Sequence, residues 1–257
     1  MSKKMLVCGC SFTFGNGLEG ENNDPRLWCN QLANKLGYSL TNIAENGRNN
    51  DWIFVETALE QSKNYYDLII VAWSAMPRFN YNLGFELYTT MSNFSGQYSI
   101  GTNPENYDEK WQRNVGDKLL RAYNFHWDFL KLVKYINILK KQCGSKIYFV
   151  NALGPWSDNF FTKKDIEMPS ELDDFTQQLL HTNNRDDKEI LELYNKMHEM
   201  YTNAGGINEE LWLNLYNNFR TMMVDRGNDG EHPGYLSHDL FTEMLYKRLT
   251  SFKTMLY

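Results

Sequence analysis

Residues 67–73 read Asp-Leu-Ile-Ile-Val-Ala-Trp, and this stretch decides the fold class. Every residue after Asp67 in it is apolar, and polar and apolar side chains do not alternate. A strand buried on both faces has this continuous pattern, whereas a strand with one face in water alternates. The stretch therefore predicts a parallel strand inside a sheet that helices cover on both sides.

Apolar runs and helical patterns alternate along the rest of the chain. Short apolar runs next to turn residues predict strands, and apolar residues at helical spacing predict helices. The other expected strands are residues 5–8, 39–43, 146–150 and 221–224. The expected helices are residues 26–36, 51–61, 118–142, 186–203, 208–219 and 235–252. The apolar positions of the second helix are Ile53, Val55, Ala58 and Leu59. This order predicts one α/β domain over residues 1–257 with a mostly parallel sheet.

Two segments interrupt that order. Residues 75–117 are rich in Asn, Gly, Tyr and Ser, and residues 151–185 are irregular and polar. Long segments of this kind in a compact domain are usually insertions or functional lids. We therefore expect a single domain that carries two insertions.

Composition narrows the class of protein. The chain has 257 residues and a formal net charge of −6, without a long Lys/Arg cluster, so nucleic-acid binding through phosphates is not expected. Its four cysteines fit neither a disulfide framework nor a zinc site, and we interpret them as small buried hydrophobes. The apolar run near the N-terminus is too short for a signal peptide, and no stretch is long enough for a membrane helix. A cytoplasmic protein that does not bind membranes is expected.

Polar, glycine-containing segments follow four of the predicted strands. They are residues 9–15 (GCSFTFG), 42–50 (NIAENGRNN), 73–78 (WSAMPR) and 229–234 (DGEHPG). In open parallel sheets, functional sites form beyond the carboxyl ends of the strands. These four segments are therefore expected to meet at one edge of the sheet.

In this order and at these spacings, the four segments resemble the conserved blocks of SGNH/GDSL hydrolases. The resemblance extends from Gly9 to Pro233, and similar starts occur in SGNH-like proteins of bacteria and their phages. It implies a flavodoxin-like, three-layer α/β/α sandwich around a mostly parallel, five-stranded sheet. It also implies ester hydrolysis or acyl transfer by a serine triad, without a metal or an organic cofactor.

Ser11 matches the family's nucleophile, since a serine between glycines after a strand can expose its hydroxyl on a tight turn. His232 matches the base, and Asp229 matches the acid that orients it. Asp225 is a second candidate for the acid. The family usually has Asp before the serine, where this chain has Cys10. Taken singly, the serine is also compatible with a polar loop or a helix cap, and the histidine with a solvated loop.

The oxyanion hole that the resemblance implies has a departure from the family pattern. Its donors would be the amides of Ser11 and Gly47, although Gly47 is also compatible with an ordinary turn. The family places a donor asparagine in the third block, where this chain has Ser74. Three alternatives follow: Ser74 donates in its place, another donor such as Asn80 is recruited, or activity is weak or lost.

Candidate substrate contacts are Trp73, Arg78 and Asn46, together with Trp156. Arg78 would bind an anionic or sugar substrate, or it is a structural surface arginine. His126, His198 and His238 are explained better by packing than by metal binding, and no metal-binding motif occurs.

The first functional hypothesis is a serine esterase or deacylase that acts on a small-molecule ester, with an acylated carbohydrate as the favoured substrate. The second is a glycan- or protein-binding module that has kept the fold and lost catalysis. Acyl transfer is a third alternative, and the sequence does not separate it from hydrolysis.

Overall fold

The predicted buried strand is β3 (Leu68–Trp73), and all six of its residues are buried in the computed structural model. It pairs in parallel with β1 (Lys3–Cys8) on one side and with β7 (Ile147–Asn151) on the other. A further parallel strand, β2 (Tyr38–Asn42), flanks β1, so the sheet order is β2-β1-β3-β7. From β1 the chain first adds β2 on one side and then β3 on the other, and this reversal of strand order is that of a doubly wound α/β sheet.

The structure describes residues 3–74, 78–82, 88–93, 98–100, 125–143, 146–153, 213, 219–220 and 222–254. The expected helix at 186–203 and residues 118–124 of the helix expected at 118–142 lie outside this part.

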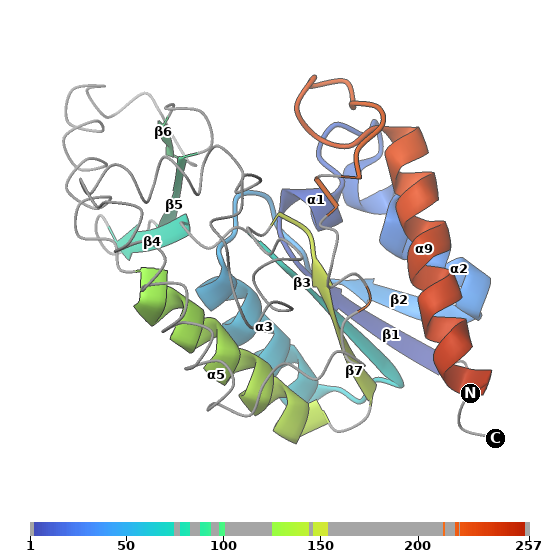
Figure 1. Cartoon of the computed structure of the whole chain (residues 1–257), viewed down its shortest axis with the longest axis horizontal. Coiled ribbons are helices and arrows are strands. Elements are labelled where there is room, and N and C mark those ends of the chain that lie inside the picture. Colours follow the sequence, from blue (N-terminus) through green and yellow to red (C-terminus); the bar gives the residue numbers. More distant parts are fainter. Residues whose placement is uncertain are drawn as a thin grey trace, which may run out of the picture.

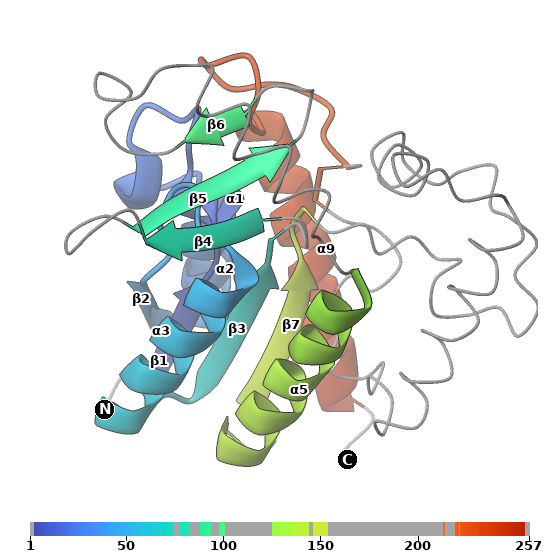
Figure 2. The same ribbon diagram turned by 90° about the vertical axis from the view of Figure 1, so that its left-hand side faces the viewer.

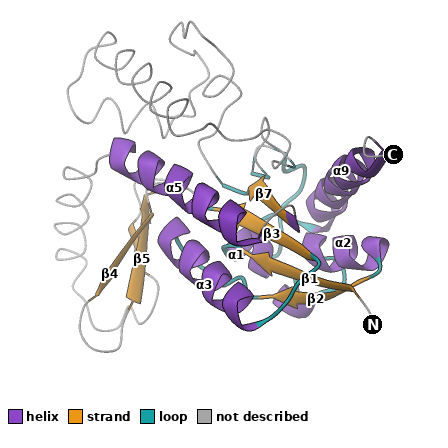
Figure 3. Ribbon diagram, turned by 90° about the horizontal axis from the view of Figure 1, so that it is seen from below, coloured by secondary structure: helices purple, strands orange, loops and turns teal. Residues whose placement is uncertain are grey.

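Two pairs of helices cover the faces of the sheet (Figures 1 and 3). One face carries α3 (Asn50–Lys63) and α5 (Phe125–Cys143). The other carries α2 (Trp28–Leu36) and α9 (Tyr235–Thr254), which pack closely on each other. The α/β/α architecture expected from the sequence is therefore confirmed, with four sheet strands rather than five in the part of the chain that the structure describes.

The packing of α2 and α9 follows from their apolar positions. Leu27, Trp28 and Leu32 are completely buried, and the Trp28 ring meets Phe241 of α9 edge-on at 5.6 Å between centroids. Gly37 ends α2 in the left-handed conformation at φ 72°, and its amide caps the last turn. This packing holds α9 on the same face of the sheet as α2.

The face that α3 presents to the core differs from the expected one. Its buried residues are Asn50, Ile53 and Thr57, whereas Val55 and Leu59 are each 46% exposed. The polar members can be buried because each has an internal partner, and the Thr57 hydroxyl donates to the Ile53 carbonyl at 2.7 Å.

The expected strand at 221–224 is also wrong for residues 222–224, which form no strand. Residues just before this segment, rather than the segment itself, form hydrogen bonds to β7 and to the residue after it. The amides of Leu213, Phe219 and Arg220 donate to the carbonyls of Phe149, Asn151 and Ala152. Neither Leu213 nor Phe219 is helical, although both fall in the helix expected at 208–219.

A separate antiparallel sheet lies inside the first predicted insertion. It contains β4 (Arg78–Asn82), β5 (Tyr88–Asn93) and β6 (Tyr98–Ile100), in that order. Figure 2 shows it beyond the ends of β3 and β7, on the side to which both strands point. The remainder of this insertion and residues 154–185 of the second lie outside the described residues.

Candidate active site at the carboxyl edge of the sheet

Segments after three neighbouring strands lie side by side at the carboxyl edge of the sheet. The register pairs Cys8 with Val71 and Val7 with Asn42, so β1, β2 and β3 end at similar heights. The amide of Glu45 donates to the Gly9 carbonyl, which joins the segment after β2 to the segment after β1. The first three sequence blocks therefore reach one edge, as expected.

Ser11 is the first residue of the short helix α1 (Ser11–Phe14) and is only 2% exposed. The amides of Thr13 and Phe14 donate to the Cys10 carbonyl, which closes the turn. The amides of Ser11 and Phe12 precede the first helical hydrogen bond, so they have no acceptor within the helix. Gly9 permits the tight turn, because a β-carbon there would lie 2.4 Å from the Thr13 hydroxyl oxygen.

His232 and Asp229 form a close pair on the loop before α9. The Nδ1 atom of His232 lies 2.6 Å from Oδ2 of Asp229. The other carboxylate oxygen accepts hydrogen bonds from the amides of Glu231 and His232, at 2.9 and 3.0 Å. An ionised carboxylate only accepts, so the network assigns the proton of a neutral His232 to Nδ1 and leaves Nε2 as the acceptor.

The surroundings of Asp229 favour its charged form. Burial by itself would raise the pKa of Asp229, but the hydrogen bonds from the His232 and Glu231 amides and from the His232 ring outweigh it. The pKa of Asp229 therefore lies below its ordinary value. A carboxylate held ionised in this way can both orient an imidazole and stabilise its protonated form.

The loop that carries this pair packs directly on the turn that carries Ser11. The Asn228 amide donates to the Gly17 carbonyl at 2.8 Å, and the ring centroids of Phe12 and His232 are 5.4 Å apart. The first and fourth blocks are thus brought together, as expected from the sequence. Within the described part of the chain, no hydrogen bond joins the Ser11 hydroxyl to His232. Catalytic hydrogen bonds are often long or poorly aligned before substrate binds.

Asp225, the second candidate for the acid, has a different task. Its carboxylate accepts hydrogen bonds from the amides of Leu236 and Ser237, at 2.9 and 2.7 Å, and from the Ser237 hydroxyl. These are donors of the first turn of α9, which have no partner inside the helix. The structure therefore assigns the histidine's carboxylate partner to Asp229 and a helix-capping role to Asp225.

The second block forms an open turn near this edge. Gly47 has φ 73° and no atom within 4 Å of the position that a β-carbon would take. Asn46, beside it, is exposed. Asn42 fastens the block to the nucleophile turn, because its Nδ2 donates to the Thr13 carbonyl at 3.0 Å and its Oδ1 accepts from the Ala44 amide.

The third block is buried at its start. Trp73 is 0% exposed and stacks on Phe149 with 6.0 Å between ring centroids, so this side chain belongs to the core and not to a substrate cleft. Ser74 is also 0% exposed, and within the described part of the chain its hydroxyl has no hydrogen-bond partner. The backbone of Arg78 and Asn80 lies in β4, and their side chains fall outside the description, as do Trp156 and His198 and the side chain of His126.

His238 is a core residue, as expected from the sequence. Its Nδ1 accepts from the Trp28 amide at 3.4 Å, and its ring meets Phe219 edge-on. Burial lowers the pKa of His238 to about 4, despite the opposing influence of nearby carboxylates. This histidine is therefore neutral at physiological pH and does not substitute for His232.

Sequence reasoning missed two residues that organise this edge. Asn50 binds the main chain of Ser74 with its side chain, and Phe12 supports the imidazole of His232. A polar residue at a buried helical position was a usable signal for Asn50, since such a residue needs a partner. Nothing in the local sequence signals the contact of Phe12 with His232.

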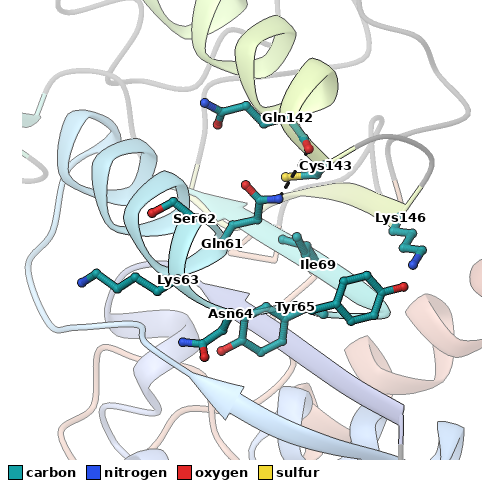
Figure 4. A pocket seen from close by; sticks show the side chains of 10 residues that line it. Gln61, Ser62, Lys63, Asn64, Tyr65, Ile69, Gln142, Cys143 and Lys146 are labelled. Atoms are coloured by element: carbon teal, nitrogen blue, oxygen red, sulfur yellow. Dashed lines mark hydrogen bonds between the residues drawn. The ribbon is translucent and has the colours of Figure 1, made fainter.

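A pocket of about 430 Å³ lies at the opposite end of the sheet (Figure 4). It is lined by the ends of α3 and α5 and by the start of β3, with Lys63, Tyr65, Ile69, Cys143 and Lys146 among its residues. Burial raises the pKa of Cys143 to about 11, so its thiol is a poor nucleophile. The pocket holds none of the four sequence blocks.

The described residues contain no group of three or more His, Cys, Asp or Glu side chains that could hold a metal ion. Among the same residues, none of the helices has the length and the apolar character required to cross a membrane.

No protein-family model and no curated protein sequence matches the chain. Solved structures do. A lipase/acylhydrolase from Enterococcus faecalis is 12% identical, with 97% of this chain and 96% of that chain covered and a TM-score of 0.44. The esterase EstA from Pseudoalteromonas is 11% identical, with coverages of 98% and 99% and a TM-score of 0.46. A carbohydrate esterase of family 2 from Corynascus thermopiles is 14% identical, with coverages of 97% and 66% and a TM-score of 0.48.

Other solved structures that match are described as a GDSL-like lipase from Bacteroides thetaiotaomicron and an SGNH hydrolase from Slackia heliotrinireducens. They are 15% and 9% identical to this chain, with TM-scores of 0.41 and 0.36, so the likeness to these hydrolases is one of fold.

Proposed function

We propose that this protein hydrolyses carboxylic esters, with Ser11 as nucleophile, His232 as general base and Asp229 as the group that orients His232. The observation that carries the proposal is the 2.6 Å contact between Asp229 and His232, on a loop that packs against the turn of Ser11. A base held in one tautomer beside a serine turn is the arrangement that acyl transfer through a serine requires.

The reaction would proceed in two steps. His232 Nε2 takes the proton of the Ser11 hydroxyl while Ser11 Oγ attacks the ester carbonyl, and the proton then passes to the departing alcohol. Water attacks the acyl-enzyme in the second step with His232 again as the base, which releases the acid and restores Ser11. The amides of Ser11 and Gly47 and the hydroxyl of Ser74 are the proposed donors to the oxyanion.

We place the ester on a carbohydrate. Trp73 is withdrawn from this role because it is buried in the core. The support that remains is the polar rim of the second block, where Asn46 is exposed and the Arg48 guanidinium lies 4.9 Å from the centre of the Trp52 ring. Arginine, amide and aromatic side chains together suit a ring that bears hydroxyl groups.

The test is hydrolysis of p-nitrophenyl acetate and of an acetylated xylo-oligosaccharide by the wild type, Ser11→Ala and His232→Ala. Activity in the wild type that both variants lose while their circular dichroism is unchanged would support the esterase. A fluorophosphonate probe should label the wild type at Ser11 only. No turnover of either ester and no labelling would favour a binding module.

A further inference from the structure

Asn50 and Ser74 are joined by two hydrogen bonds between a side chain and a main chain. The Ser74 amide donates to Asn50 Oδ1 at 2.8 Å, and Asn50 Nδ2 donates to the Ser74 carbonyl at 3.0 Å. The first residue of α3 is thereby bound to the residue that follows β3, across 24 positions of sequence. Both residues are buried, at 8% and 0% exposure.

This pairing changes what Ser74 can offer to a ligand. Its amide already has an acceptor, so the main chain at this position cannot donate to a substrate. Its hydroxyl is buried and has no hydrogen-bond partner among the residues that the structure describes. A buried hydroxyl without a partner destabilises the folded state, so it calls for an explanation, and a ligand oxygen that accepts from it would supply one.

The asparagine is not required to begin the helix. The N-cap of α3 is Asn49, whose side chain accepts a hydrogen bond from the Trp52 amide at 2.9 Å. The Asn50 side chain points instead to the end of β3, where both of its polar atoms are used on Ser74. Helix capping therefore does not account for Asn50.

We propose that Asn50 is a positioning residue of the oxyanion site, which fixes the backbone of Ser74 so that the Ser74 hydroxyl donates to the substrate oxygen. This inference rests on the proposed function. As the bond from Ser11 Oγ to the carbonyl carbon forms, the carbonyl oxygen gains negative charge and accepts a hydrogen bond from Ser74 without proton transfer. A serine hydroxyl rotates more freely than an asparagine amide, so its donor needs a fixed backbone. Since Ser11 is itself 2% exposed, water is scarce there and each donor gains strength.

A double-mutant cycle tests this role. In hydrolysis of p-nitrophenyl acetate we expect Ser74→Ala to lower kcat by about 10²-fold, the usual effect of removing one oxyanion donor. Asn50→Ala should lower kcat by roughly 10- to 100-fold with KM within about twofold, because the lost interaction exists only in the transition state. In the Ser74→Ala background, Asn50→Ala should cost no more than about twofold further, because the donor that it positions is absent.

Thr57→Val is the matched control. Thr57 is buried on the same helix, and its hydroxyl donates to Ile53 of that helix at 2.7 Å, so the variant perturbs α3 without touching Ser74. Its kcat should equal that of the wild type. Asn50→Asp serves where the alanine variant does not fold. It keeps the acceptor for the Ser74 amide but turns an oxygen toward the Ser74 carbonyl, and kcat should fall by about tenfold or more.

The outcomes separate this inference from the proposed function. Ser11-dependent turnover in the wild type, with losses for Asn50→Ala and Ser74→Ala that multiply in the double variant, would overturn the positioning role alone. So would an Asn50→Ala variant, or an Asn50→Asp variant used in its place, as active as Thr57→Val. Absence of Ser11-dependent turnover in the wild type would overturn the proposed function and, with it, the positioning role.

Discussion

Gly227 and Gly17 touch through their backbones, and this contact joins the loop of His232 to the turn of Ser11. A β-carbon at Gly227 would lie 2.5 Å from the Gly17 carbonyl oxygen, a distance that no stable contact allows. A β-carbon at Gly17 would lie 3.2 Å from Cβ of His232. The space between the two proposed catalytic segments is therefore set by two residues that lack side chains.

Gly227→Ala should reduce esterase activity far more than its effect on stability explains. The methyl group must push the loop away from Gly17, which moves His232 away from Ser11. A displacement of about 1 Å at a catalytic group can cost about 10² in rate. We expect a loss of that order in kcat, measured with p-nitrophenyl acetate, and a loss of about 1–3 kcal/mol in the free energy of unfolding.

Gly230→Ala is the control for this prediction. Gly230 lies in the same loop at φ 72°, with no atom near the position of a β-carbon. Alanine there should lower the free energy of unfolding by about 1–2 kcal/mol through backbone strain alone. It should leave kcat close to the wild-type value. Equal kcat losses in the two variants would contradict the role given to the contact between the glycines.

Asp229→Asn and Asp225→Asn should have opposite effects. An amide at position 229 can turn its nitrogen toward Nδ1 of His232, which favours the wrong tautomer of the imidazole. We expect kcat to fall by a factor on the order of 10³–10⁴, with little change in stability. The Asp225 carboxylate accepts from Leu236 and Ser237 at the start of α9, so its variant should keep its activity and lose about 1 kcal/mol of stability.

Steady-state kinetics and urea denaturation of both variants check this prediction. A large loss of kcat in Asp225→Asn, beside an active Asp229→Asn, would exchange the roles of the two carboxylates.

The sequence was sufficient for the central strand β3 because its pattern is unambiguous. A continuous apolar run predicts burial of both faces of the strand, and all six residues of β3 are buried. In α3, by contrast, the expected apolar positions were Ile53, Val55, Ala58 and Leu59. Ile53 is the one of these four that is buried, and Asn50 and Thr57 are buried with it. Hydrophobicity ranks side chains one at a time, whereas burial of a polar side chain depends on a partner that folding brings near.

The candidate site follows the same division. The local pair Asp229 and His232 was predictable, because three positions of sequence separate two groups of complementary chemistry. The link between Asn50 and Ser74 was not, since it joins residues 24 positions apart through the geometry of a helix start and a strand end. The choice of Asp229 over Asp225 also needed the structure, because the start of α9 engages Asp225.

The cysteines should be unreactive in the folded protein. Cys8, Cys10 and Cys29 are each 0% exposed, and burial raises the pKa of Cys8 to about 12. Cys143 is partly exposed, but its pKa of about 11 leaves roughly 100-fold less thiolate at pH 8 than the ordinary value of 9.0 would. Iodoacetamide should modify Cys143 slowly and the other three only after unfolding in guanidinium, as mass spectrometry would measure.

Esterase activity should survive this treatment. Inactivation that follows alkylation of Cys10 in the folded protein would show that the thiol beside Ser11 is accessible and would contradict its burial.

His238 should make the protein sensitive to mild acid. The pKa of this side chain is lowered from 6.5 to about 4 in the folded protein. The unfolded chain therefore binds a proton near pH 6.5 while the folded chain does not, so stability falls as the pH decreases from 6.5 toward 4. The contribution of neutral His238 to the free energy of unfolding is fully present above pH 6.5. About 3 kcal/mol of it should be lost by pH 4.

Urea denaturation of the wild type and of His238→Gln between pH 7 and pH 4 isolates this contribution. Asp24, Asp225 and Asp229 also have lowered pKa values. Their contribution to the stability of the protein is lost near and below pH 3.8, and it is the same in the wild type and the variant. Glutamine does not titrate, so the advantage of the wild type over the variant should shrink by about 3 kcal/mol as the pH falls from 7 to 4. A constant difference would mean that His238 takes up its proton as readily in the folded protein as in the unfolded chain, and that its burial is incomplete.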